Sequence, residues 1–390
     1  MLSGVSVVSF THFLQGPSAT QILADLGADV IKVEPTGGAF ERGWSGPDAY
    51  LDGESVFFLL GNRNARSLSI DMKAPESIAL LRKLLAEADV LVESFRPGTM
   101  ERLGLGYESL KELNPRLVYC SLSGYGADGP YKDRPGQDVL IQSLSGLAHA
   151  TGGGDTPPTP VGASIVDQHG AVLGALGILA ALHGRERTGR GCLVESNLLS
   201  AALDLQIEPL AYHLNGSRGE RSPSRISSMF YKAPYGVFPT ADGHICVSIT
   251  APPVLAAVLD DPWFASVADD EVLARREEVN ERVAGHLAAR TTKEWEDLFT
   301  ERKVWFAPVN DYAAVVDDPQ VRHNESVLRF DHPTAGEVAV LGHPVRYDGE
   351  RPGLRSLPPA LGEHTRAVLA ELDLTAEQID ALVAKGVVRG

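Results

Sequence analysis

The alternation of short apolar strands with helical segments constrains the fold of this chain more than any other feature. Residues 5–10 form an apolar run, a helical pattern follows through residue 24, and residues 29–34 form a second strand pattern. The alternation recurs over a helix pattern at 78–85, a strand at 90–92, a helix at 107–113 and a strand at 117–122. Repeated strand–helix–strand units predict an α/β fold with a parallel, doubly wound sheet and helices on both faces.

The middle of the chain changes character twice. Residues 172–182 are apolar on every side, which predicts a centrally buried helix, and residues 197–214 predict another helix. Ser, Arg, Gly and Pro then dominate residues 216–235, as is typical of a linker. A strand pattern at 244–250 and a charged amphipathic helix pattern at 271–290 predict a smaller α+β unit.

The C-terminal part begins with a second irregular stretch at residues 317–334 and ends with helix patterns around 365–372 and 375–385. At 390 residues, the chain is long enough for two domains. We therefore expect a large domain over 1–215, a linker over 216–235, a small α+β domain over 236–316, a second linker over 317–334, and a C-terminal segment over 335–390 that returns to the large domain.

The charge balance excludes one class of partner. The 35 basic and 51 acidic residues give a net charge of −16, which repels a nucleic-acid backbone. An anionic ligand must instead be held by a few local Arg or Lys side chains and by helix N-termini.

Several absences point to a cytoplasmic protein. The N-terminus shows no signal-peptide pattern, and no wholly apolar run reaches the roughly 18 residues of a membrane span. The three cysteines are widely separated, and the 11 histidines show no metal-ligand spacing. We expect no metal site, no membrane association and a reducing compartment.

The segment 162–170 contains the most informative carboxylate. Asp167 stands just before the apolar helix, where Asp is a favoured N-cap residue. A carboxylate held there, with Gly162 and Gly170 allowing a ligand to approach, is also suited to attack an acyl carbon as an ionised nucleophile. The two interpretations are compatible.

Two further segments lie just beyond predicted strands, where open α/β sheets bind ligands. The segment 10–17 opens a helix with Gly16-Pro17 but lacks the dinucleotide-binding glycine spacing, so an ordinary strand-to-helix turn is the alternative. Arg96 and Arg102 concentrate positive charge in an otherwise acidic chain. They could bind phosphate groups, and the alternative is that they are solvated surface residues.

Short motifs in a fixed order resemble the family III CoA-transferases, of the formyl-CoA transferase and carnitine-CoA transferase type, which are related to α-methylacyl-CoA racemase. They cover nearly the whole chain: Gly16-Pro17, 26–34, 66–73, 95–98, 102–104, 188–191, 318–321, His332-Pro333 and 361–364. Each motif is short, and their specificity comes from their combination and order.

The resemblance implies site residues and a reaction. Asp167 holds the position of the family's nucleophilic aspartate, and the implied CoA-binding residues are His12, Phe13, Leu14, Gln15, Ile70, Phe95, Arg102, Leu103 and Gln137. The implied reaction moves CoA from an acyl-CoA thioester to a carboxylic acid acceptor through an aspartyl anhydride and an aspartyl-CoA thioester. Coenzyme A is then a substrate, and no cofactor is needed. The implied assembly is an interlocked homodimer with a Rossmann-like large domain.

The chain departs from its relatives at three places. Leu14 replaces the loop glutamine of formyl-CoA transferase, with Gln15 one residue later, and the tetra-glycine loop of that enzyme is not found. Gln137 replaces the histidine of the racemases, so a two-base proton transfer lacks one base. An acyl-CoA racemase or isomerase nevertheless stays the main alternative. A nicotinamide-dependent dehydrogenase and a non-catalytic acyl-CoA-binding protein are the other two.

Overall fold

The computed structural model describes residues 1–390 except 155, 220 and 222–229. The chain divides into two compact units, each built from separate stretches of sequence. The first unit contains residues 1–141, 163–205 and 319–390, and the second contains 142–162 and 206–318. Part of the expected linker at 216–235 lies outside the described residues, and the expected domain boundaries stay predictions.

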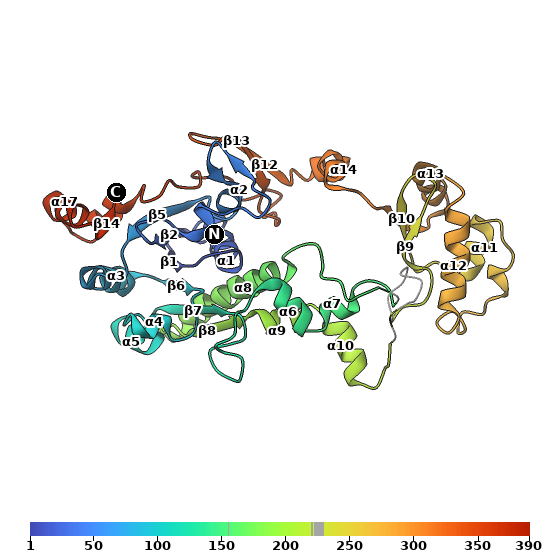
Figure 1. The fold of residues 1–390 in the computed structure, drawn as a ribbon, viewed down its shortest axis with the longest axis horizontal. Coiled ribbons are helices and arrows are strands. Elements are labelled where there is room, and N and C mark those ends of the chain that lie inside the picture. The colour runs from blue at the N-terminus through green and yellow to red at the C-terminus, as the bar shows by residue number, and fades with distance from the viewer. Residues whose placement is uncertain (155, 220, 222–229) are drawn as a thin grey trace. The chain divides into compact units, whose positions relative to one another are not determined.

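A seven-stranded sheet forms the centre of the first unit (Figure 1). All neighbouring strands run parallel except β14, which runs antiparallel to β5. A mixed α/β fold with a mainly parallel sheet is therefore confirmed. The strands in spatial order are β14 (Val388–Arg389), β5 (Ala65–Ile70), β2 (Asp29–Glu34), β1 (Ser6–Phe10), β6 (Val90–Glu93), β7 (Val118–Ser123) and β8 (Leu193–Asn197).

Helices cover both faces of this sheet. One face packs against α3 (Pro75–Glu87), α4 (Thr99–Arg102), α5 (Tyr107–Leu113), α16 (Thr365–Glu371) and α17 (Ala376–Ala384) through buried aliphatic side chains. The other face packs against α1 (Gln15–Asp25) and α8 (Ile165–Thr188). Because parallel strands end at the same edge, the turns that follow β1 and β6 lie side by side.

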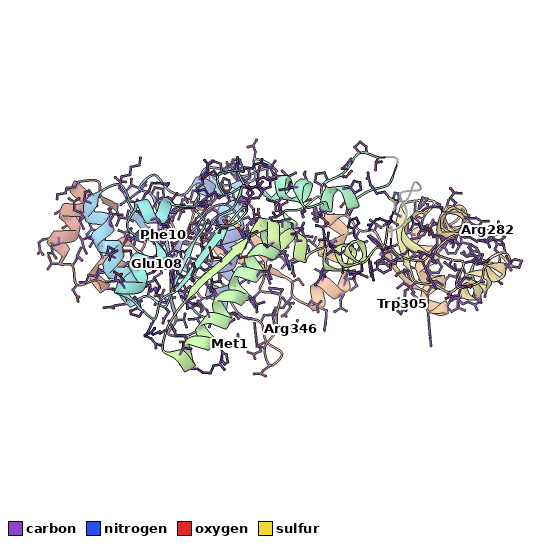
Figure 2. The ribbon with its side chains drawn as sticks, turned by 90° about the horizontal axis from the view of Figure 1, so that it is seen from below. Met1, Phe10, Glu108, Arg282, Trp305 and Arg346 are labelled. Carbon is purple, nitrogen blue, oxygen red and sulfur yellow. The ribbon has the colours of Figure 1, made fainter. Side chains whose placement is uncertain are left out.

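The second unit has its own core around an antiparallel sheet of β9 (Tyr235–Pro239), β10 (His244–Ser248) and β11 (Trp305–Pro308). Helices α11 (Pro252–Val258), α12 (Arg276–Leu287) and α13 (Thr292–Arg302) complete that core. Figure 2 labels Arg282 on α12 and Trp305 at the start of β11.

The remaining elements are short. In the first unit they are η1 (Phe40–Arg42), β3 (Tyr50–Leu51), β4 (Glu54–Ser55), α2 (Val56–Leu59), α9 (Leu198–Asp204), α15 (Pro319–His323), β12 (Val327–His332) and β13 (Gly336–Leu341). In the second they are α7 (Leu147–Ala150), α10 (Ile207–Leu214), η2 (Phe264–Ser266) and α14 (Tyr312–Asp317). Helix α6 (Asp138–Leu144) begins in the first unit and ends in the second.

Sequence patterns missed β5 because its buried residues include serines. Ser67 is fully buried and its hydroxyl donates to Glu34 Oε1 at 2.7 Å, so hydrogen bonding replaces hydrophobicity there. The single helix expected over 197–214 is two helices, α9 and α10, and Asn197 is the last residue of β8. The irregular stretch expected at 317–334 is wrong, because α15 and β12 occupy most of it.

Helix α8 is not buried all round, contrary to the sequence prediction. Ala171, Ala175 and Ile178 pack inward, whereas Val172 and Leu176 are 50% and 60% exposed in the single chain. By length and composition, α8 is also the one helix among the described residues that would suffice to cross a membrane. Core helices pass the same test, and α8 packs on α1 and on the sheet.

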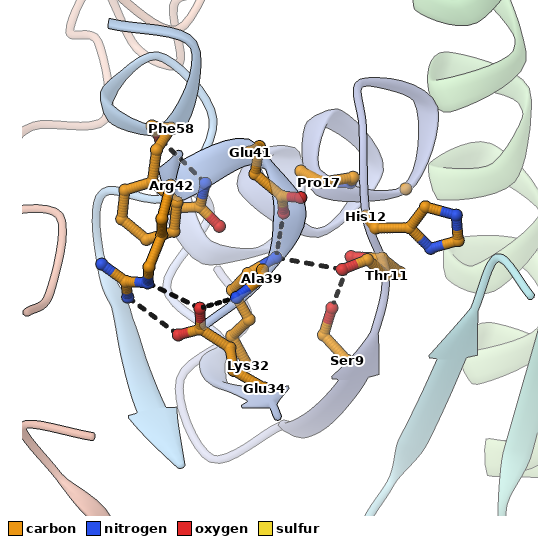
Figure 3. Close-up of polar contacts among 12 residues, drawn as sticks. Ser9, Thr11, His12, Pro17, Lys32, Glu34, Ala39, Glu41, Arg42 and Phe58 are labelled. Carbon is orange, nitrogen blue, oxygen red and sulfur yellow. Dashed lines mark hydrogen bonds and ion pairs between the residues drawn. The ribbon is translucent and has the colours of Figure 1, made fainter. Parts of the chain in front are cut away.

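A buried ion pair fixes the chain just beyond β1 (Figure 3). Lys32 and Glu41 are almost completely buried, and Lys32 Nζ donates to Glu41 Oε1 at 2.9 Å and to the Thr11 carbonyl at 3.0 Å. Arg42, one residue later, donates twice to Glu34 at 2.6 and 2.8 Å. These contacts attach η1 and the turn after β1 to the neighbouring strand β2.

Replacing Lys32 by Met should lower the free energy of unfolding by about 3–5 kcal/mol, because the Glu41 carboxylate would stay buried without its cation. The double variant Lys32→Met, Glu41→Leu should recover most of this loss, since it removes both charges. Denaturant unfolding of both variants measures the effect. A single variant as stable as the wild type would contradict the importance of the pair.

Candidate active site

The turn between β1 and α1 brings four expected CoA-binding residues together. His12 and Leu14 are partly buried, Phe13 is exposed, and Gln15 is buried. Phe13 has φ 59°, a left-handed conformation that is uncommon for a bulky residue. A Cβ on Gly16 would lie 2.5 Å from Thr11 Cβ, so the tight turn requires glycine there.

His12 connects this turn to the end of β6. Its main-chain N–H donates to Ser94 Oγ at 3.2 Å, and its Nδ1 lies 3.3 Å from the same oxygen. Its ring stacks on Phe95 at a centroid distance of 5.7 Å and points away from Lys32 (Figure 3). Burial lowers the pKa of His12, which favours the neutral imidazole. His12 is thus positioned as a neutral group on the binding edge of the sheet.

Exposed aromatic rings continue from the turn. Phe13 contacts Phe40 at 5.1 Å between centroids, Phe40 stacks on Trp44 at 5.7 Å, and Trp44 meets Phe57 edge-on at 5.0 Å. Phe13, Phe40 and Trp44 are each more than a third exposed. Such a surface suits the apolar part of a ligand.

Asp167 is the third residue of α8, so the interpretation of this residue as the N-cap is wrong. Ser164 holds the N-cap position but makes no side-chain capping bond. Asp138, from the start of α6, takes that role: its Oδ2 accepts the main-chain N–H groups of Val166 at 2.8 Å and of Asp167 at 3.0 Å. A carboxylate from another helix therefore satisfies two of the free amides of α8.

Burial raises the pKa of Asp167 to about 7, with the nearby Asp138 carboxylate as the second cause. This pKa differs from the expectation that Asp167 stays ionised, because near neutral pH the protonated and ionised forms are both present. Desolvation outweighs the helix N-terminus, which favours an anion by only about 0.3–1 kcal/mol. A carboxylate in such surroundings is poorly solvated and correspondingly reactive when it does ionise.

Gln15 joins the turn to α8. A Cβ built on Gly170 would lie 2.6 Å from Gln15 Nε2, so the amide rests directly on the glycine one helical turn after Asp167. The Gln168 side chain adds a second link, donating to Ser18 Oγ at 3.3 Å. The turn after β1 and the nucleophile candidate thus belong to one site.

The other predicted residues are spread more widely. Arg102 is exposed at the end of α4, where its side chain donates to Thr99 Oγ1 at 2.9 Å, and Leu103 is partly buried beside it. Gln137 is exposed immediately before Asp138. Ile70 is fully buried in the core, so its side chain does not face a ligand, and only its main chain lies at the sheet edge.

No cluster of three or more potential metal-ligating side chains occurs among the described residues. The absence of a metal stays a prediction. Glu93 is a separate buried carboxyl at the end of β6, where burial raises its pKa to about 7 and Ser121 Oγ donates to it at 2.5 Å.

Sequence reasoning missed Asp138 and Ser94. Asp138 is the first residue of α6, and nothing in the sequence links it to α8, which begins at Ile165. Ser94 is a small polar residue in a loop and carried no signal. Both act through contacts between segments that are distant in sequence.

Comparison with known proteins decides the family. A model of CoA-transferase family III matches residues 2–365. The chain belongs to CoA-transferase family III. It is therefore an enzyme, a CoA-transferase.

Two relatives and one structure illustrate the similarity. Succinyl-CoA:glutarate CoA-transferase from Mus musculus is 33% identical over 99% of this chain and 90% of that protein. Succinyl-CoA:mesaconate CoA-transferase from Haloarcula hispanica is 34% identical over 95% of this chain and 96% of that protein. The crystal structure of a CAIB/BAIF family protein from Brucella suis superimposes with a TM-score of 0.82 at 32% identity, covering 95% and 99% of the two chains.

Replacing Asp138 by Asn should move the acidic limb of the pH profile of kcat/KM to lower pH. Asn keeps an oxygen that accepts both amides of α8 but removes the charge that helps to raise the pKa of Asp167. The shift should be partial, because burial is the larger cause. Asp138→Ala should instead lose about 1–2 kcal/mol of stability. An Asn variant with the wild-type profile would show that the charge plays no part.

Asp167→Asn should stabilise the folded chain at alkaline pH. The pKa of Asp167 is about 7 in the folded chain, against an ordinary value of 3.8 for a solvated aspartate. Between these values the unfolded chain ionises first, so wild-type stability falls as pH rises and the full penalty is present above about pH 7. The variant escapes this penalty and should gain about 1–3 kcal/mol at about pH 8. Thermal unfolding across pH should show no gain at about pH 4.

Proposed function

We propose that this enzyme transfers CoA between short dicarboxylic acids, with succinyl-CoA as donor, through acyl intermediates on Asp167. The observation that carries the mechanism is the partly buried Asp167 carboxyl, held at the start of α8 and raised in pKa. The substrates are proposed from the relatives, whose names specify succinyl-CoA with glutarate or mesaconate.

The first half-reaction forms an aspartyl-CoA thioester. An Asp167 oxygen attacks the thioester carbon of the donor, the C–S bond breaks, and a mixed anhydride and the CoA thiolate result. The thiolate sulfur then attacks the aspartyl carbonyl carbon, and the C–O bond to the donor breaks. The donor leaves as a carboxylate that keeps one oxygen from Asp167.

The second half-reaction is the reverse with the acceptor. A carboxylate oxygen of the acceptor attacks the aspartyl thioester, releasing the thiolate and forming a new anhydride. The thiolate attacks the acceptor's carbonyl carbon, and Asp167 leaves as a carboxylate. Each step exchanges one activated acyl bond for another, so the proposal includes no cofactor and no metal, and we propose the cytoplasm as its compartment.

We propose that CoA binds along the carboxyl edge of the sheet. The turn at His12–Gln15 and the ring of Phe95 would contact the pantetheine arm, and Arg102 would meet a phosphate. Arg102 suits this role because it is exposed and its hydrogen bond to Thr99 engages only one of its donors. The overall charge of −16 makes such a local cation necessary.

We propose an interlocked homodimer of Rossmann-like large domains and smaller domains. Its support is the apolar surface that one chain leaves exposed near the site, on α6, α8 and α9. The residues are Leu140, Val172, Leu176 and Leu203, all at least 41% exposed. A second chain covering them would give α8 the all-round burial that its composition predicts.

Trapping with hydroxylamine tests the proposal. Enzyme incubated with succinyl-CoA alone should accumulate an activated acyl group on Asp167, which hydroxylamine converts to a hydroxamate. Peptide mass mapping should find the modification at Asp167 and nowhere in the Asp167→Asn variant. Catalytic turnover without any adduct would argue against the covalent route. Exchange of the α-proton of the acyl group without an acceptor would favour the racemase alternative.

A further inference from the structure

Gln15, the first residue of α1, is a buried polar residue whose side-chain nitrogen is unused. The residue is only 7% exposed. Its Nε2 is buried and has no hydrogen-bond partner among the described residues. An unpaired buried donor costs about 1–3 kcal/mol, so its retention calls for a partner at another stage of the reaction.

The position of this amide relative to α8 indicates that partner. Gln15 Nε2 lies 2.6 Å from where a Cβ of residue 170 would be. A helical side chain covers the turn on the N-terminal side of its own Cα, so the space over Gly170 extends toward Asp167. Asp167 and Gly170 are three residues apart and share one helix face. The Gln15 amide therefore lies over the helix face that Gly170 shares with Asp167.

In the resting structure the Gln15 amide donates to no oxygen of Asp167. A hydrogen bond to the resting carboxylate would stabilise the anion and reduce its reactivity. A neutral amide that stands near the carboxyl, without bonding to it, avoids this cost. In the covalent route the acyl group forms on the Asp167 side chain. The buried Gln15 Nε2 therefore needs no exposure to solvent to act on it.

We propose that the Gln15 side-chain amide is a catalytic hydrogen-bond donor to the carbonyl oxygen of the acyl group formed on Asp167. The proposal rests on the covalent route described above. When the thiolate sulfur attacks the aspartyl carbonyl carbon, the C=O electron pair moves onto this oxygen. The pair returns as the C–O bond to the donor carboxylate breaks, and no proton is transferred. Gln15 Nε2 donates to the oxygen while it carries the charge.

Gly170 allows the Gln15 amide to hold this position. Any side chain at this position would push the amide away, since a Cβ would meet Gln15 Nε2 at 2.6 Å and Gln15 Cδ at 3.3 Å. The glycine therefore provides the space that holds the donor over the helix. Gly170→Ala displaces the amide and leaves its chemistry unchanged, which gives a second and independent variant.

The test compares Gln15→Met with Gln168→Met. Methionine keeps the length of the side chain and removes the amide. Gln168 is a matched control, since it is also a glutamine between α1 and α8 and donates to Ser18 rather than into the site. The rate at which the Asp167 adduct forms from succinyl-CoA in a single turnover should fall about 100-fold in Gln15→Met and in Gly170→Ala. It should change less than about threefold in Gln168→Met.

Stability separates a catalytic role from a structural one. Gln15→Met removes an unsatisfied polar group, so its melting temperature should equal or exceed that of the wild type. An adduct that forms at the wild-type rate in a folded Gln15→Met variant would overturn the proposal. A loss of rate accompanied by an equal loss of stability would also overturn it. The absence of any adduct in the wild type would instead reject the covalent route itself.

Discussion

The carboxylate of Asp138 accepts two main-chain hydrogen bonds at the first turn of α8, and the geometry of the site depends on this contact. It fixes the helix start that carries Asp167 and satisfies amides that the helix leaves free. It also places a second negative charge beside a carboxyl that burial already makes hard to ionise. The same interaction therefore positions Asp167 and raises the energy of its charged form. A helix N-terminus alone would do the opposite and stabilise the anion.

A buried pair of opposite charges holds the other side of the site, in contrast to the two carboxylates at the start of α8. Lys32 pairs with Glu41 and donates to the Thr11 carbonyl, so the turn after β1 is attached to the neighbouring strand β2. The turn places the His12 ring against the ring of Phe95 and the Gln15 side chain against Gly170. The turn and the helix start are thus fixed independently, and they meet at the Gln15 amide. Rigid support from two sides is what an acyl-transfer site requires, since small displacements of the reacting groups are costly.

Much of the fold follows from periodicity, and the departures have physical causes. The first strands and the final helices match the sequence patterns, because their buried residues are aliphatic. Strand β5 was missed because Ser67 is buried through a hydrogen bond to Glu34. Helix α8 was predicted to be wholly buried, yet Leu176 is exposed, because composition alone does not say which side of a helix packs on the sheet.

The site was predicted less completely than the fold. Motifs led to Asp167 and to the turn at His12–Gln15, since these lie beside recognisable glycines. The role of Asp138 depends on contact between residues 29 positions apart, which the sequence does not encode in any spacing. Ile70 was named from a motif, and a motif does not show whether a side chain faces the site or, as here, is buried in the core.

In every turnover an Asp167 oxygen should form a covalent bond to an acyl carbon. Isotope transfer from the acceptor to Asp167 measures this directly. Enzyme is allowed to turn over succinyl-CoA with an acceptor dicarboxylate whose carboxyl groups carry heavy oxygen, and the peptide containing Asp167 is then weighed. The anhydride route leaves one acceptor oxygen on Asp167 in each cycle, so the peptide should gain heavy oxygen until both carboxyl positions are labelled. An Asp167 peptide that stays unlabelled after many turnovers would contradict the account.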